Sequence, residues 1–163
     1  MELQDALKKI VCSFERYYNV KWENVTSPFM VEAEFHSHDE NYYLIRSLRL
    51  FESESKEYVF FAGEHILTEK RLNELDQIAW EEGLSRVRPG EGHKSTDVTL
   101  IVLAEQVEDA VWKRAPKIHH YKSYWFSLHG WSQYRLAVIE VSSGQTATNR
   151  QGRDLQSLVS MRK

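Results

Sequence analysis

The sequence predicts an α+β fold, a single domain over residues 1–163 with helices packing on a mainly antiparallel sheet. The predicted order of elements is α-β-β-β-α-β-α-β-β-β-α. Apolar residues recur at three- and four-residue steps near the start of the chain and again after residue 67, which indicates helices with one buried side. Elsewhere, runs rich in β-branched and aromatic residues are bounded by polar turns, which is typical of strands.

The chain opens with a predicted helix and continues into three predicted strands. After the break at Ser27-Pro28, strands are expected at about 30–38, 41–51 and 57–63, joined by the polar turns HDEN and ESESK. Together these strands predict an antiparallel meander. The apolar stripe of the opening helix consists of Leu3, Leu7, Ile10, Val11, Phe14 and Tyr17.

A second helix is predicted after Thr68, because Leu67 and Leu72 are placed to pack around an N-cap at that position. This helix is expected to end near Gly83. Residues 86–97, RVRPGEGHKSTD, lack periodicity and predict a loop that feeds the next strand. That strand, VTLIVLA, is apolar at nearly every position, as expected of a central strand covered on both faces.

The remaining elements are a helix, three strands and a helix. A short helix at about 106–115 is expected to end before Pro116. Two long strands, YKSYWFSLH and WSQYRLAVIEV, turn at Gly130, and a short strand QTATN follows. The last helix is expected from about residue 153.

Composition excludes several classes of protein. Apolar residues make up 42% of the chain and charged residues 28%, a balance typical of a folded globular protein. The net charge of -3 lacks the basic excess of a dedicated nucleic-acid binder. No apolar run approaches the ~18 residues of a membrane span and no signal segment is evident, so we expect no membrane partner. The single cysteine, Cys12, favours a reducing cytoplasm.

His36 and His38 form the first candidate site. If Asp39-Glu40 is the loop of a hairpin, Val31 lies opposite Leu48 and the two histidines lie on the polar face with Glu34. One interpretation is a solvated face with Glu and Arg paired across strands. The other is a divalent metal site, since histidines two apart on a strand can share a metal and Glu34 could complete the ligand set. No HExxH or CxxC motif supports the metal interpretation.

The loop HKSTD is the second candidate site, a possible ligand loop at the mouth of the central strand. It offers His93, Ser95, Thr96 and Asp97, and loops at strand ends often carry binding residues. The alternative is that these side chains hydrogen-bond the backbone of a turn. The chain has no GxSxG, GxxxxGK[ST] or GxGxxG motif, so catalytic residues and a nucleotide cofactor stay unassigned.

Two further stretches could contact macromolecules. The basic segment 113–122, KRAPKIHHYK, precedes aromatic residues, a mixture that single-strand nucleic-acid binders use. The favoured explanation is a helix C-terminus that carries favourable positive charge and is followed by a strand. Trp125, Trp131 and Tyr134 surround the Gly130 turn and predict either core packing or a surface for a protein partner.

At HKSTDVTLIVLAE, YWFSLHGWSQYRLAVIEV, TNRQG and FHSHDENYYLIRS, the chain resembles an uncharacterised family of small bacterial cytoplasmic proteins, a domain of unknown function. The resemblance covers most of the chain and implies a cytoplasmic α+β domain. It transfers no functional residue, because these stretches are strands and turns rather than catalytic signatures.

The sequence therefore predicts a non-enzymatic cytoplasmic domain that binds a protein or a small ligand, with self-association as a homodimer through a sheet edge or the aromatic hairpin. A metal-dependent hydrolase that uses His36 and His38 is the first alternative. Nucleic-acid binding through 113–122 is the second.

Overall fold

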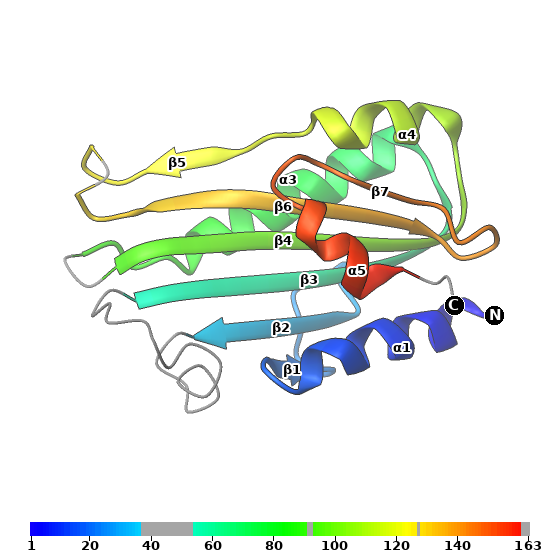
Figure 1. Cartoon of the computed structure of the whole chain (residues 1–163), viewed down its shortest axis with the longest axis horizontal. Helices are drawn as coiled ribbons and strands as arrows, with labels where there is room; N and C mark the ends of the chain where they lie inside the picture. The colour runs from blue at the N-terminus through cyan, green and yellow to red at the C-terminus, as the bar shows by residue number, and fades with distance from the viewer. Residues whose placement is uncertain (37–53, 91–92, 127, 161–163) are drawn as a thin grey trace.

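The structure is a computed structural model that describes residues 1–36, 54–90, 93–126 and 128–160. A mixed sheet of seven strands forms its centre, and helices lie on both faces (Figure 1). The helices α1 (Leu3–Glu15) and α5 (Gln156–Val159) cover one face. The helices α3 (Glu69–Ser85) and α4 (Asp109–Arg114) cover the other.

The strands follow the order β1-β2-β3-β4-β6-β5. The short strands β5 and β7 both pair with β6, β5 with residues 131–133 and β7 with residues 137–139. Short 3-10 turns at Ala115–Lys117 and Arg153–Leu155 follow α4 and precede α5. The strand bounds are β1 Asn19–Lys21, β2 Val31–His36, β3 Glu54–Leu67, β4 His93–Val107, β5 Tyr121–Ser123, β6 Trp131–Glu140 and β7 Thr146–Thr148.

The predicted α+β class is confirmed, but the sheet is mixed rather than mainly antiparallel. Its three long strands, β3, β4 and β6, run parallel to one another, while the β1-β2, β2-β3, β5-β6 and β6-β7 pairs are antiparallel. The reason is the position of the helices in the chain. A helix that returns across a face of the sheet brings the next strand back in the same direction, as α3 does between β3 and β4.

The strand β2 has a different neighbour from the one predicted. Val31 lies opposite Phe61 of β3, and Phe35 lies opposite Glu57. On the other edge, β1 pairs with residues 32–34, so a continuous ladder between 30–38 and 41–51 with Val31 opposite Leu48 is wrong. Residues 41–51 themselves lie outside the described residues.

The central strand β4 is covered on both faces, as predicted. Leu100 and Val102 point into the core beneath α3 and α4, and Ile101 and Leu103 point into the core beneath α1 and α5. The strand is longer than predicted because it begins at His93, so Ser95, Thr96 and Asp97 are strand residues rather than loop residues.

The helices follow their sequence signals. The Thr68 hydroxyl caps α3 by accepting a hydrogen bond from the Arg71 backbone N–H at 3.0 Å. The stripe predicted on the opening helix is buried at Leu7, Ile10, Val11 and Phe14. Burial of these side chains supplies most of the stability of each helix, because isolated helices of this length are marginal in water.

Asn149 joins the end of β7 to β6 and to the loop after α4. Its Oδ1 accepts hydrogen bonds from the backbone N–H groups of Leu136 and Gly152, both at 2.9 Å. Its Nδ2 donates to the carbonyl oxygens of Tyr134 at 3.0 Å and Ile118 at 3.1 Å. All four hydrogen-bonding positions of this buried amide are therefore used. The TNRQG stretch is thus a structural turn.

We expect Asn149→Ala to lower the free energy of unfolding by at least about 3 kcal/mol. It leaves buried N–H and carbonyl groups without partners, and each such group costs ~1–3 kcal/mol. The matched control is Asn73→Ala, at an exposed position on α3, with an expected change within about 0.5 kcal/mol. Urea unfolding measures both variants. A loss below about 1 kcal/mol at Asn149 would contradict this account of the turn.

Gly83 lets α3 pack closely against β4. A Cβ atom at this position would lie 2.5 Å from Cγ2 and 2.7 Å from Cγ1 of Val98, which is fully buried. We expect Gly83→Ala to destabilise the fold by about 1–3 kcal/mol. The double variant Gly83→Ala/Val98→Ala should recover part of this loss, whereas Gly90→Ala, with nothing within 4 Å, should be neutral. Thermal unfolding distinguishes these outcomes, and equal stability of Gly83→Ala and Gly90→Ala would refute the close packing.

Candidate functional site

Three polar side chains lie side by side near the amino ends of the parallel strands. The register places Glu57 of β3 opposite Asp97 of β4, and Asp97 opposite Gln133 of β6. Side chains opposite one another in adjacent strands share a face, so all three lie on the α1 and α5 side of the sheet. The apolar core beneath α1 begins two residues further along β3, at Val59, and four residues further along β4 and β6, at Ile101 and Ala137.

A cavity of about 500 Å³ opens over these residues. The sheet provides its floor, the residues after α1 provide an aromatic wall, and the turn before α5 provides a polar wall. Its lining residues are Tyr17, Tyr18, Phe35, Ser55, Lys56, Glu57, Ser95, Asp97, Gln133, Arg135, Gln151, Asp154 and Leu158.

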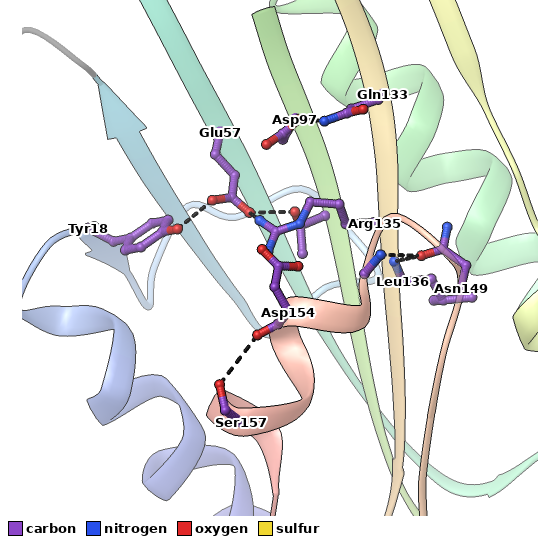
Figure 2. A network of polar contacts seen from close by, with 11 residues as sticks. Tyr18, Glu57, Asp97, Gln133, Arg135, Leu136, Asn149, Asp154 and Ser157 are labelled. Atoms are coloured by element: carbon purple, nitrogen blue, oxygen red, sulfur yellow. Dashed lines mark hydrogen bonds and ion pairs between the residues drawn. The ribbon is translucent and has the colours of Figure 1, made fainter. Parts of the chain in front are cut away.

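Glu57 is the centre of a polar network in the floor of the cavity (Figure 2). The Tyr18 hydroxyl donates a hydrogen bond to Oε1. The Thr99 hydroxyl and Nη1 of Arg135 both donate to Oε2, each at 2.5 Å. Glu57 is only 5% exposed, so these three donors replace the water that an ionised carboxylate requires.

Arg135 links the sheet to the turn before α5. Its Nη2 lies 2.7 Å from Oδ2 of Asp154, while Nη1 binds Glu57. Burial opposes the positive charge, but Glu57 and Asp154 outweigh burial and raise the pKa of Arg135. The guanidinium is therefore held charged between two carboxylates, as Figure 2 shows.

Tyr18 acts as a fixed hydrogen-bond donor. Burial and the neighbouring negative charge of Glu57 raise the pKa of its hydroxyl well above the ordinary value. The hydroxyl therefore stays protonated near neutral pH and donates to Glu57.

Of the three carboxylates that line the cavity, Glu57 and Asp154 pair with Arg135, whereas Asp97 forms no ion pair with the residues that the structure describes. Burial and the charge of Glu57 raise its pKa from 3.8 to about 6. Its Oδ1 accepts a hydrogen bond from Nε2 of Gln133 at 2.8 Å. Within the described ranges, no group donates to Oδ2. Asp97 is thus partly protonated near neutral pH and has an unused acceptor atom.

Gln151 contributes a second unused acceptor. Its Oε1 is buried and accepts no hydrogen bond from the residues that the structure describes. Gln151 lines the same cavity as Asp97. Buried polar atoms in proteins almost always have a partner, so the buried Oε1 of Gln151 is an exception. Together with Oδ2 of the half-buried Asp97, it makes this cavity the candidate site.

The structure divides the residues of the predicted HKSTD loop between two faces. Ser95 and Asp97 line the cavity. Thr96 is buried on the opposite face, because successive strand residues alternate. The backbone of His93 begins β4, and its side chain lies outside what the structure describes.

The predicted metal residues are not assembled by the described part of the chain. Glu34 lies beside β1, at a smaller cavity of about 320 Å³. His36 ends β2, but its side chain lies outside the described residues, as does the whole of His38. Among the described residues, no group of three or more His, Cys, Asp or Glu side chains is arranged to hold a metal.

The polar face of β2 is not solvated at Glu32, contrary to the solvated-face interpretation. Glu32 is 4% exposed and its Oε1 lies 2.7 Å from Nη1 of Arg86, at the end of α3. Burial opposes its charge, but hydrogen bonds from Arg86 and Thr26 outweigh burial and lower its pKa. The expected Glu and Arg pair therefore exists, but it joins the sheet to a helix rather than two strands.

The aromatic residues around Gly130 separate into surface and core. Trp125 is 65% exposed and Trp131 is half-buried. Tyr134 is fully buried against Trp80 and His120, so it is not part of the predicted partner surface. It lies on the α3 side of β6, where the sheet alternation turns every second side chain into the core.

The basic segment 113–122 spans three elements. Lys113 and Arg114 occupy the last turn of α4, where positive charge is favourable, and Lys122 lies on the exposed strand β5. His120 binds the Asp76 carboxylate through Nε2, at 2.9 Å from Oδ1. This arrangement agrees with a helix end followed by an edge strand, and nucleic-acid binding stays a prediction.

Sequence reasoning missed most of the cavity residues. Tyr18, Glu57, Arg135, Gln151 and Asp154 come from four separate segments. A signal was available for two of them, since Glu57 and Arg135 are charged residues that interrupt the apolar strands EYVFF and YRLAVIEV. A charge within a buried strand requires a partner, which the sequence alone does not identify.

Comparisons with known proteins identify a family but no activity. Residues 2–161 match the profile of a family described as a domain of unknown function (DUF8052). Neither the curated proteins nor the solved structures gave a match. Of the helices in the described residues, none combines the length and apolar character that a membrane crossing requires.

The raised pKa of Asp97 predicts that this residue destabilises the fold above pH 6. The unfolded chain releases the proton near pH 4 and the folded chain only near pH 6, so stability falls as pH rises between these values. We expect Asp97→Asn to be more stable than the natural chain at pH 7.5, by at most about 3 kcal/mol. Both proteins should be equally stable below pH 4. Urea unfolding across this pH range measures the difference in stability, with the exposed Asp109→Asn as the control. If Asp97→Asn is less stable than the natural chain at pH 7.5, the prediction is wrong.

Proposed function

We propose a function from the site alone, because the chain belongs to a family of domains of unknown function, as its sequence resemblance predicted. The domain binds a small polar molecule in the cavity over Glu57, Asp97 and Gln133. The observation that carries this proposal is the pair of unused acceptors, Oδ2 of Asp97 and Oε1 of Gln151, at one cavity.

The size and lining of the cavity support binding of a small molecule. A volume of about 500 Å³ falls within the ~300–1,000 Å³ typical of ligand pockets. Such pockets combine apolar walls with a few fixed polar groups that orient the ligand. Here Tyr17, Phe35 and Leu158 supply apolar surface, and the Glu57 network fixes the polar floor.

Binding fits the site better than catalysis. The described lining residues include no histidine or cysteine, the side chains that most often transfer protons or attack a substrate. The Tyr18 hydroxyl and both oxygens of Glu57 are already used within the protein. Asp97 accepts a hydrogen bond from Gln133, and the nearby Ser95 hydroxyl donates to the Ser55 hydroxyl at 3.5 Å rather than to a general base.

The finer points of the proposal come from the sequence. A chain with one cysteine supports a cytoplasmic location, and the resemblance supports a bacterial origin. Self-association is supported by the apolar side chains at the tip of the β5-β6 hairpin, where Phe126 is 91% exposed and Leu128 is 71% exposed.

The test is a fragment screen by ligand-observed NMR, using amines, alcohols and carboxylic acids of up to about 15 heavy atoms. We expect some fragments to bind the natural chain and to lose binding in Ser95→Phe, because a phenyl ring at this lining position fills the cavity. Gln151→Leu should weaken the same fragments, since it removes one unused acceptor.

The matched control is Asn19→Phe, which fills the smaller cavity beside β1. Its fragment binding should equal that of the natural chain. The proposal fails if no fragment binds, or if Asn19→Phe rather than Ser95→Phe abolishes binding. Thermal unfolding of each variant verifies that it is folded before it is screened.

A further inference from the structure

We propose that the ligand of this cavity is an organic cation whose N–H-bearing ammonium group binds Asp97. This inference rests on the proposed function and specifies the chemical class of the ligand. Three features of the cavity point to it: its charge balance, its free acceptors and its aromatic wall.

The charge balance of the lining favours a cation. Glu57, Asp97 and Asp154 contribute three carboxylates, against Arg135 and Lys56. Both terminal nitrogens of Arg135 are engaged, one with Glu57 and the other with Asp154. Arg135 is therefore already paired with carboxylates of the protein. A ligand anion would be repelled by the lining, in which carboxylates outnumber cations.

The free hydrogen-bond acceptors of the lining also favour a cationic ligand. Oδ2 of Asp97 and Oε1 of Gln151 accept nothing from the described residues, and both belong to the lining. An ammonium group supplies several N–H donors and no acceptor, which suits a lining with acceptors left over. A hydroxyl supplies one donor only, and a carboxylate supplies none.

The aromatic wall suits a cation with an apolar body. Tyr17, Tyr18 and Phe35 line one side of the cavity, and Leu158 adds aliphatic surface. Aromatic faces attract cations through their quadrupole and also bury apolar carbon. An arylalkyl amine satisfies both the wall and the carboxylate.

A cationic ligand would also stabilise the ionised form of Asp97, which lies near two other carboxylates. The groups around it are Glu57 and Lys56 on β3, Gln133 and Arg135 on β6, Asp154 before α5 and Tyr18 after α1. Of these, Glu57 and Asp154 raise the pKa of Asp97, and Arg135 opposes them. A bound ammonium would favour the ionised carboxylate, so amine binding should weaken as Asp97 becomes protonated.

The experiment compares three probes that share a phenylethyl group by isothermal titration calorimetry: 2-phenylethylamine, 2-phenylethanol and 3-phenylpropanoate. At pH 7.5, we expect the amine to bind at least ten-fold more tightly than the alcohol, and the carboxylate not to bind. At pH 5, the amine should bind about ten-fold more weakly, because about a tenth of Asp97 is then ionised.

Asp97→Asn should lose both the preference for the amine and its pH dependence. Asp109→Asn, an exposed position on α4 over the other face, should keep both. The inference is overturned if the amine does not bind, if the alcohol or the carboxylate binds as tightly, or if Asp97→Asn keeps the preference. Should neutral or acidic fragments still bind in a manner that Ser95→Phe abolishes, the proposed function stands and only the ligand class is wrong.

Discussion

The buried ion pair between Arg135 and Glu57 is the interaction on which the rest of the site depends. It crosses the central strand β4, where Thr99 donates to the same carboxylate oxygen. Breaking a buried pair by removing one partner typically costs ~3–5 kcal/mol, because a charge is left without solvent. Beside this pair, burial and the charge of Glu57 raise the pKa values of Tyr18 and Asp97.

The site lies at an unusual end of the sheet. In open α/β folds, ligands usually bind beyond the carboxyl ends of parallel strands. Here α1 and α5 pack on residues from Val59 onward in β3 and from Ile101 onward in β4, and the residues after α1 reach the amino ends. The polar residues therefore gather where the helices stop. The cost is a desolvated Asp97, which is a common sign of a site shaped for binding rather than for stability.

Several sequence signals were structural rather than functional. The TNRQG stretch holds a turn through Asn149, and Gly152 is required there because a Cβ would lie 2.6 Å from the Leu136 carbonyl oxygen. Tyr134 packs in the core. Of the HKSTD residues, Ser95 and Asp97 line the cavity, because alternate residues of β4 share one face of the sheet.

The sequence by itself determined the α+β class, the capped helix after Thr68 and the doubly buried strand β4, because each depends on local periodicity and neighbouring residues. Only the tertiary structure decided that β3, β4 and β6 are parallel, and that β2 pairs with β1 and β3. The site is likewise tertiary, because Arg135 and Glu57 are separated by 78 positions and meet only through the strand register. Register sets which face each charge occupies, and no local pattern encodes it.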